Sequence, residues 1–296
     1  MYMSEIGKRF KDIQLYNSNM RKSLGDKLYF LEHLPDCSFT LVDFGCADGS
    51  LINELCSIFR NYEHEVRFIG YDCSEEMINL ARSNFYGEVS DDVTFTNSWD
   101  VVKKKLLGEE DLNVDLNRKN VLILSSVIHE VYSYAKDQEE IDEFWDRVLN
   151  SGFDYIVIRD MMLDPGIERA RAGMYDMCQV KNSSKYESYQ YDSFKEKWGG
   201  IVSQKNLIHF LLKYRWKVNW ERELNENYFP INTAELYDKI ILSGNYRLDY
   251  WERFRVPFLD ECFKRDFNIE LDEYTHLKAI FRRYNFSEPN DAPAGN

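Results

Sequence analysis

The stretch Phe39-Thr-Leu-Val-Asp-Phe-Gly-Cys-Ala-Asp-Gly-Ser-Leu-Ile-Asn-Glu-Leu-Cys56 decides the fold of this 296-residue chain. It begins with an apolar run, Phe39 to Phe44, that is typical of a buried parallel strand and carries an acid, Asp43, near its carboxyl end. In the turn that follows, small residues let backbone N–H groups approach a ligand. Ser50 can cap the next helix, whose leucines and isoleucines recur at helical spacing. This order predicts the nucleotide-binding end of a doubly wound α/β sheet.

A second strand ends on an acid about 20 residues after these glycines, the spacing of a nucleotide-binding fold. It is Val66-Arg-Phe-Ile-Gly-Tyr-Asp72, and the carboxylate of Asp72 can accept both hydroxyls of a ribose. Ser74 then caps another helix that has acids in its first turn. The two strand ends together predict a phosphate- and nucleoside-binding site in which Asp72 holds the ribose.

The two motifs in register resemble those of the class I S-adenosylmethionine-dependent methyltransferases. They read Asp43-Phe-Gly-Cys-Ala-Asp-Gly49 and Gly70-Tyr-Asp-Cys-Ser-Glu-Glu-Met77. A dinucleotide-binding dehydrogenase needs glycines at the G-x-G-x-x-G positions, where this chain has Gly45, Ala47 and Ser50. Ala47 is a departure from the middle glycine of the family pattern.

The resemblance implies S-adenosyl-L-methionine as the cofactor, with Asp43 at its methionine end, which bears an ammonium. It also implies an α/β fold with a doubly wound, mostly parallel seven-stranded sheet, an antiparallel last strand, and a helical cap inserted after strand five. Trp99, just after a short third strand, can offer a ring face to the adenine, and Asn97 or Ser98 a polar contact. Ser98 stands where the family usually has an Asp. The expected cofactor-binding residues are Asp43, Gly45, Cys46, Ala47, Gly49, Asp72, Cys73, Met77, Asn97, Ser98, Trp99 and Ser125.

A fourth buried strand, Asn120 to Ser125, delivers polar residues to the place where acceptor and methyl group should meet. His129 can remove a proton from the acceptor, because its reference pKa is about 6.5; the alternative is that it packs or binds without moving a proton. Glu130 can orient His129, bind a cationic acceptor or cap a helix. Asp160, after a fifth strand at 153–158, can bind or deprotonate substrate, although an ion pair with Arg159 is favoured. His129, Glu130 and Asp160 are the candidate catalytic residues.

Composition sets the expected organisation and the classes of partner. The segments are N-terminal lid helices (1–36), a cofactor-binding core (37–163), a helical substrate cap (164–243), a return to the sheet (244–284) and a flexible tail (285–296). The first helix either covers the cofactor, with Tyr16, Asn17 and Met20 near substrate, or merely packs on the sheet. The net charge of −14, from 37 basic and 51 acidic residues, disfavours nucleic acid and anionic membranes.

Six cysteines without a C-x-x-C pair or clustering with histidines predict reduced thiols and no metal site. No stretch reaches transmembrane length, so a soluble, cytoplasmic protein is expected. The sequence leaves the oligomeric state open.

The sequence therefore predicts a methyltransferase that acts on an O or N atom of a small-molecule acceptor. One alternative is an RNA or nucleotide methyltransferase that uses the basic residues Lys205, Lys213, Arg215, Lys217 and Arg222. Another is a non-catalytic, cofactor-binding regulatory protein.

Overall fold

A single mixed sheet of seven strands organises the computed structural model, which describes residues 24–86, 92–108 and 117–284. The strand order is β3-β2-β1-β4-β5-β7-β6. The strands are β1 (Phe39–Phe44), β2 (Val66–Tyr71), β3 (Val93–Thr96), β4 (Lys119–Ser125), β5 (Tyr155–Met161), β6 (Tyr246–Phe254) and β7 (His276–Arg283).

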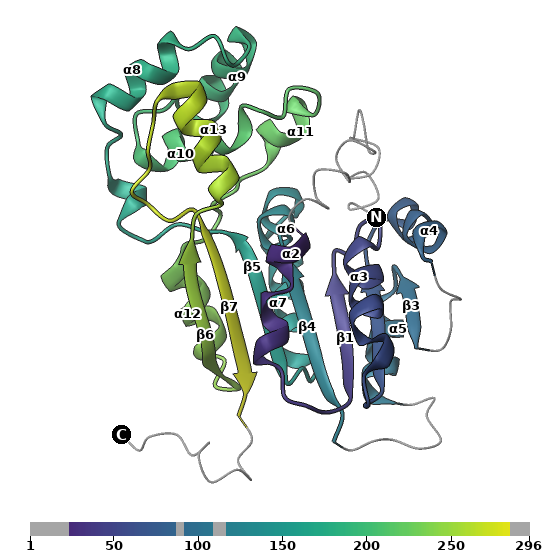
Figure 1. Cartoon of the computed structure of the whole chain (residues 1–296). Helices are drawn as coiled ribbons and strands as arrows, with labels where there is room; N and C mark the ends of the chain where they lie inside the picture. Colours follow the sequence, from purple (N-terminus) through teal and green to yellow (C-terminus); the bar gives the residue numbers. More distant parts are fainter. Residues whose placement is uncertain (1–23, 87–91, 109–116, 285–296) are drawn as a thin grey trace, which may run out of the picture.

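Strands β1 to β5 are parallel, and β7 lies antiparallel between β5 and β6. All six residues of β1 are buried, as expected of a central strand covered on both faces. The carboxyl ends of the parallel strands meet at one edge, drawn uppermost in Figure 1. The predicted doubly wound α/β sheet with an antiparallel last strand is confirmed.

Helices α2 (Leu24–Lys27) and η3 (Tyr29–His33), the latter a 3-10 helix, lead into β1. The helices of the core are α3 (Ser50–Ile58), η4 (Phe59–Asn61), α4 (Glu75–Asn84), α5 (Trp99–Leu107), α6 (Ile128–Tyr134) and α7 (Gln138–Asn150). After β5 come η5 (Ile167–Arg169), α8 (Met174–Asn182), α9 (Ser188–Trp198), α10 (Gln204–Lys213), α11 (Trp220–Asn225), α12 (Thr233–Ile241) and, between β6 and β7, α13 (Pro257–Phe267).

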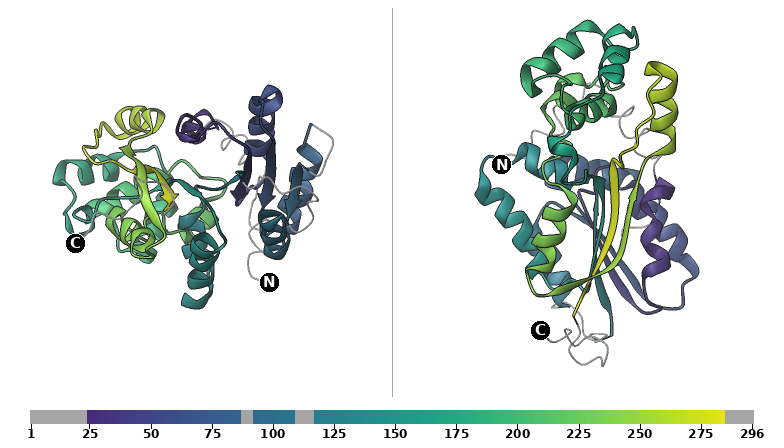
Figure 2. Two further views of the ribbon diagram at one scale, coloured as in Figure 1. Left: turned by 90° about the horizontal axis from the view of Figure 1, so that it is seen from below. Right: turned by 90° about the vertical axis from the view of Figure 1, so that its left-hand side faces the viewer.

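Two layers of helices cover the sheet, as the edge-on view in Figure 2 shows. Apolar residues of α5, α6, α7 and α12 pack on one face, and those of η3, α3 and α4 on the other. The phenol of Tyr29, just after α2, donates to the carbonyls of Ile158 and Ala279 at 2.7 and 2.9 Å. The described part of the leading segment therefore packs on the sheet, while Tyr16, Asn17 and Met20 lie outside the described residues.

A second apolar core forms beyond the carboxyl ends of β4 and β5, from the helices that follow β5 (Figure 1). It contains α8 to α11 and also α13, whose Phe263 and Phe267 are buried in it. Helix α12 falls in the segment expected to form the cap, yet its Leu236 and Ile240 pack against the sheet. Sequence order misleads here because α13 returns to the cap between two strands of the sheet.

Several element boundaries differ from those expected. The polar, tyrosine-rich segment 183–192 is predicted from the sequence to be a loop, but α9 begins within it, at Ser188, behind a capping box between Glu187 and Gln190. Apolar spacing predicts a helix from Ile167 to Met177, whereas the structure has a short 3-10 turn at Ile167–Arg169 and α8 begins only at Met174. The sixth strand is predicted to begin at Tyr250, and β6 begins at Tyr246. These errors arise where tyrosines and charged residues obscure the apolar spacing.

Candidate functional site

The turn after β1 runs through left-handed backbone conformations that hold it close to its neighbours. Gly45, Ala47 and Gly49 have φ angles of 78°, 45° and 76°. A Cβ atom at Gly45 would lie 2.8 Å from Cγ2 of Val127, so no larger residue fits. The amide N–H groups of Gly45 and Cys46 donate to the carbonyl of Tyr71 at 2.7 and 3.0 Å, which locks the turn onto the end of β2.

The helix after this turn begins differently from the prediction. Gly49, rather than Ser50, is the N-cap of α3, and the Asp48 carboxylate accepts from both the amide and the hydroxyl of Ser50. Asp48 acts here because its side chain reaches the amide two residues on, a common local turn. Ser74, by contrast, caps α4 as predicted and accepts from the amide of Met77 at 3.3 Å.

Asp43 and Asp72 stand at the ends of neighbouring strands, on either side of the turn. Asp43 is 4% exposed, and burial raises its pKa to about 7, although the charge of Lys27 opposes the rise. Burial likewise raises the pKa of Asp72 to about 6, against hydrogen bonds from the amides of Ser74 (2.9 Å) and Ala47 (3.1 Å). Two carboxylates held this way favour a ligand that brings positive charge and hydroxyl donors. We call Asp43, Asp72 and the turn at 45–49 the cradle.

The sulfur-containing residues of the cradle region are small packing groups. Cys46 is buried, and burial raises the pKa of its thiol well above the usual value. The thiol of Cys73 contacts the carboxylate of Asp72 at 3.6 Å. Met77 is buried in the first turn of α4. Their predicted contacts with a cofactor remain predictions.

The residues after β3 are arranged differently from one another. Asn97 is exposed, whereas the amide of Ser98 donates to the hydroxyl of Thr96 at 3.1 Å. The Trp99 ring is 7% exposed and meets the Tyr71 ring edge-on, with centroids 5.1 Å apart. Core packing therefore occupies the ring predicted to face an adenine, which leaves Asn97 and Ser98 as the accessible candidates.

At the end of β4 the chain turns sharply into α6. Ser126 has a φ of 60°, which is rare for a residue with a side chain. Its hydroxyl accepts from the Nη1 of Arg159 at 3.1 Å. The hydroxyl of Ser125 is buried and has no hydrogen-bond partner among the described residues. A buried hydroxyl without a partner is costly, so Ser125 is a natural contact for a bound ligand.

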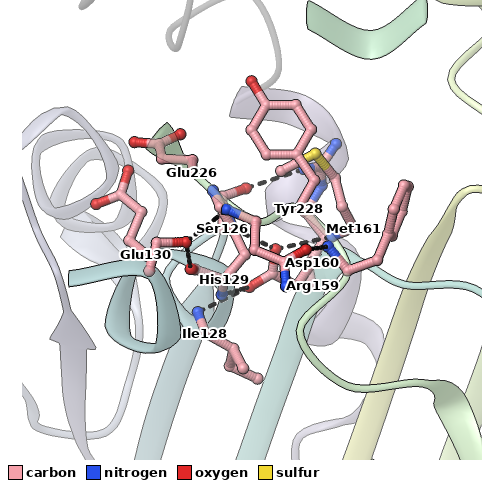
Figure 3. Close-up of polar contacts among 12 residues, drawn as sticks. Ser126, Ile128, His129, Glu130, Arg159, Asp160, Met161, Glu226 and Tyr228 are labelled. Carbon is pink, nitrogen blue, oxygen red and sulfur yellow. Dashed lines mark hydrogen bonds and ion pairs between the residues drawn. The ribbon is translucent and has the colours of Figure 1, made fainter. Parts of the chain in front are cut away.

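His129 and Asp160 form a buried pair between α6 and β5 (Figure 3). Nδ1 of His129 lies 2.7 Å from Oδ1 of Asp160. Asp160 also accepts hydrogen bonds from the amides of Ile128 (2.8 Å) and Met161 (2.7 Å). Both of its carboxylate oxygens therefore have hydrogen-bond partners within the protein. Burial lowers the pKa of His129, but the charge of Asp160 outweighs it and raises the pKa to about 9. The raised pKa favours the protonated form of His129.

The prediction that Asp160 forms an ion pair with Arg159 is wrong. Arg159 instead contacts Asp26 of α2, with Nε and Nη2 at 2.9 and 2.8 Å from Oδ2. The two neighbours differ because successive residues of a strand point to opposite faces of the sheet. Asp160 therefore faces α6, and Arg159 faces α2.

A buried cluster of charges joins α6 to the cap. Arg222 is 4% exposed and contacts three carboxylates, those of Glu130 (2.7 Å), Glu226 (2.8 Å) and Glu223 (3.2 Å). The phenol of Tyr134 donates to Glu226 at 2.9 Å. We call Glu130, Arg222, Glu223 and Glu226 the buried cluster. Sequence reasoning missed it because Glu130 lies 92 residues from Arg222 and the four residues share no motif.

The cap residue Tyr228 lies over His129. Their rings meet edge-on with centroids 5.5 Å apart (Figure 3). Lys213 is fully buried beneath the same tyrosine, 3.9 Å from the ring centroid, and donates to the carbonyls of Glu223 and Glu226. Burial lowers the pKa of Lys213 to about 7. The cap thus closes over His129 with an aromatic ring and an internal cation.

The basic face on which the RNA alternative depends is not assembled. Lys213 and Arg222 are buried, and the other members are engaged locally. Lys205 and Lys217 form ion pairs of 2.8 Å with Glu168 and Glu187, and the Arg215 guanidinium lies 4.6 Å from the Phe258 ring centroid. These five residues are close in sequence, but the helices of the cap direct them to different partners.

This chain resembles known proteins in its structure but not in its sequence. No protein-family model matches the sequence, and no curated protein matches it. One similar structure is a candidate methyltransferase from Thermobifida fusca YX, with 12% identity over 93% of this chain and 84% of that chain and a TM-score of 0.47. Another is loganic acid methyltransferase with SAH, with 10% identity, 97% and 95% coverage and a TM-score of 0.39. A third is the complex between the Haloferax volcanii Trm112 methyltransferase activator and a candidate methyltransferase. It has 12% identity over 90% of this chain and 94% of that chain, with a TM-score of 0.39.

The fold is a Rossmann-like seven-stranded mixed sheet. Structures of S-adenosylmethionine-dependent methyltransferases are among those that it resembles. Identities of 12% or less bear on the fold and leave the methyl acceptor open. No helix of the described residues is long and apolar enough to cross a membrane.

Proposed function

We propose that this protein is an S-adenosylmethionine-dependent methyltransferase that acts on an oxygen or nitrogen of a small molecule. The observation that carries the proposal is the cradle. Asp43 and Asp72, with pKa values raised to about 7 and about 6, flank a turn whose residues at 45, 47 and 49 are left-handed. A nucleoside with a cationic amino-acid extension supplies what both carboxylates lack.

Each part of the cradle has a separate task in this proposal. Asp72 accepts the ribose hydroxyls, and Asp43 pairs with the ammonium of the amino-acid end. Gly45, Ala47 and Gly49 bring the backbone close to the ligand. The bound cofactor supplies a methyl group already activated on a sulfonium, so the protein has mainly to align the acceptor and exclude water.

His129 is proposed to hold the acceptor rather than to deprotonate it. With a pKa raised to about 9 it carries a proton at neutral pH, and a protonated imidazole donates hydrogen bonds but accepts no proton. Asp160 fixes the ring orientation from Oδ1, 2.7 Å from Nδ1. Glu130 is held by Arg222 at 2.7 Å and is proposed to fix the end of the cap over the acceptor.

A small acceptor accounts for the charges better than RNA does. The chain has a net charge of −14, and Lys213 and Arg222 are buried rather than presented to a phosphate backbone. Lys205 and Lys217 are neutralised by ion pairs with Glu168 and Glu187. RNA binding that weakens steeply with salt would favour the alternative.

Calorimetric titration of the purified protein with S-adenosylmethionine tests the cofactor. Wild type should bind it, and Asp72→Asn should bind about ten- to a hundredfold more weakly, because hydrogen bonds to a charged group are lost. Asp249→Asn, at an exposed aspartate of β6, is the matched control and should bind as wild type does. Absence of wild-type binding would contradict the proposal, and unchanged affinity in Asp72→Asn would remove Asp72 from the ribose role.

Mass spectrometry then distinguishes a catalytic methyltransferase from a regulatory protein that binds the cofactor without turnover. Incubation of the cofactor-loaded protein with a cell-derived pool of small molecules should yield S-adenosylhomocysteine together with a product heavier by one methylene unit. Binding without turnover across such pools would favour the regulatory alternative.

A further inference from the structure

Strand β6 (Tyr246–Phe254) is a long strand at one edge of the sheet (Figure 1). It has nine residues, whereas β3 at the opposite edge has four. Its inner side pairs with β7, and no other strand of the described residues pairs along its outer side. The backbone groups of an open edge can pair with a strand of another chain, and proteins usually protect long edges for that reason. Strand β6 is therefore a candidate surface for contact between chains.

An irregularity in β6 changes which of its side chains share a face. The register with β7 shifts between Leu248 and Tyr250, which leaves Asp249 as an extra residue, as in a β-bulge. Side chains of an unbroken strand alternate between the two faces, and one extra residue shifts that alternation. Residues an odd number of positions apart on either side of Asp249 therefore lie on the same face of the sheet.

Two pairs of side chains occupy the two faces of β6. Leu248 and Trp251 lie on the face that α12 covers, where the Trp251 ring meets the ring of Tyr237 edge-on, with centroids 6.2 Å apart. Leu248 and Tyr237 are large apolar side chains exposed at this edge. Arg247 and Glu252 lie on the other face, and the Glu252 side chain is 42% exposed although a lysine of β7 lies 3.5 Å from it. The strand thus presents an apolar pair on one face and opposite charges on the other.

These two pairs match when β6 is placed antiparallel to a second copy of itself. A two-fold axis through the bulge puts Leu248 opposite Trp251 of the second copy. The same axis puts Arg247 opposite Glu252 of the second copy, and the symmetry repeats each pair. Directly opposite side chains of antiparallel strands have Cβ atoms about 5 Å apart, within reach of an ion pair. Because both strands carry their extra residue at the axis, the two bulges match each other.

Other registers lose this complementarity. Only a shift by two residues keeps like faces together, because a shift by one turns every side chain to the other face. A shift in one direction places Arg247 opposite Phe254 and Leu248 opposite Arg253. A shift in the other direction places Arg247 opposite Tyr250. The register centred on the bulge is the one of these three in which Arg247 meets a carboxylate.

We propose that β6 pairs antiparallel with β6 of a second copy of this chain, so that the two seven-stranded sheets join into one across a two-fold axis. Such a contact uses the same surface on both copies and closes after two, so it predicts a dimer and no larger assembly. It gives the outer backbone groups of β6 hydrogen-bond partners and covers Leu248. The inference is independent of the proposed function, because the cradle lies at the ends of β1 and β2.

Charge reversal at two positions of β6 provides the test. Sedimentation velocity of the wild-type chain should give twice the mass of one chain. Arg247→Glu and Glu252→Arg each create two like-charge pairs across the axis, so each variant alone should dimerise about tenfold more weakly or worse. An equimolar mixture of the two variants should recover the dimer, because every facing pair at these positions then carries opposite charges.

Recovery in the mixture cannot come from a contact within one chain. Arg247 and Glu252 are five residues apart along the strand, about 16 Å, which is too far for an ion pair. Asp249→Asn keeps both members of the charged pair and should dimerise as wild type does. Lys103→Glu makes the same change of charge as Arg247→Glu on the exposed side of α5, which packs on β2 and β3, and should also dimerise normally.

Four results would overturn the proposal. A wild-type chain that is monomeric even at the highest concentration reached would leave the edge of β6 to a different partner. A dimer that persists in both charge-reversal variants would place the contact on another surface. Variants that stay monomeric when mixed would show that the substitutions act within each chain. An assembly larger than two copies would contradict the two-fold symmetry.

Discussion

The cradle and the buried cluster both gather carboxylates, but they differ in the cation that each provides. In the buried cluster Arg222 contacts all three glutamates directly, although burial raises the pKa of Glu226 to about 7. In the cradle Asp72 receives backbone hydrogen bonds and the charge of Lys27 acts on Asp43, yet burial raises the pKa of both. The carboxylates of the cluster thus contact a cation of the protein, whereas no cation of the described residues forms an ion pair with Asp43 or Asp72.

This difference suggests which of the two regions serves binding and which serves structure. A buried carboxylate whose partners are all internal gains nothing from a ligand. One whose charged form is disfavoured and that contacts no cation of the protein gains from any cation that reaches it, and perturbed groups of this kind gather at functional sites. The cluster should therefore govern folding, and the cradle should govern binding at some expense of stability.

Removing the arginine of the buried cluster should have the largest effect. Arg222→Met leaves Glu130, Glu223 and Glu226 without their common partner, and we expect the free energy of unfolding to fall by about 3–5 kcal/mol. Chemical denaturation measures it, and Lys136→Met, which breaks an exposed pair, should leave stability nearly unchanged. A loss in Arg222→Met no larger than in this control would show that the cluster does not hold the cap to the core.

Removing the partner of the buried imidazole comes next. In Asp160→Asn the charge that raises the pKa of His129 is gone while burial remains, so that pKa should fall from about 9 by about 2 units or more. NMR titration of the imidazole measures it, with His129→Asn to assign the signal. The buried His209, whose pKa burial holds well below its usual value, serves as the internal control. An unshifted His129 would contradict the pairing.

Neutralising the cradle should stabilise the protein, opposite in sign to the cluster variant. The pKa of Asp43 rises from 3.8 to about 7 on folding. Its contribution to stability is therefore full below pH 3.8 and is lost as pH rises to 7. Asp43→Asn should be more stable than wild type by about 1–3 kcal/mol above pH 7 and by progressively less toward pH 4.

Thermal unfolding across this pH range measures the difference, and calorimetry should show that the variant also loses affinity for S-adenosylmethionine. Asp249→Asn, at an exposed site, should show neither effect. A destabilised Asp43→Asn would mean that Asp43 is satisfied within the protein, as the cluster is.

The smallest effect is expected within the turn of the cradle. Ala47 has a φ of 45°, where a side chain is strained, so Ala47→Gly should change the free energy of unfolding by less than about 1 kcal/mol in the stabilising direction. Gly45→Ala is the contrasting variant and should be clearly destabilising, since its Cβ would lie 2.8 Å from Val127. Denaturation curves measure both, and equal effects of the two would contradict the geometry described.

Sequence reasoning succeeded where the chain is locally consistent. Strand β1 and the Ser74 cap of α4 were predicted at their observed positions, because apolar runs, small residues and capping act over a few residues. It failed for Arg159, which was paired with its neighbour Asp160 although strand geometry sends the two side chains to opposite faces. It also treated Arg222 as a surface charge, although the cap buries it.

By itself the sequence determined the Rossmann-like sheet and the two carboxylates of the cradle, because Asp43 lies near the end of β1, Asp72 directly follows β2, and these two strands pair with each other. The tertiary structure alone decided that His129 pairs with Asp160, that Arg222 joins the cap to α6, and that Arg159 contacts Asp26. Those facts depend on burial and on charges far apart in the chain. Electrostatic energy follows distance through space, which no local pattern of residues records.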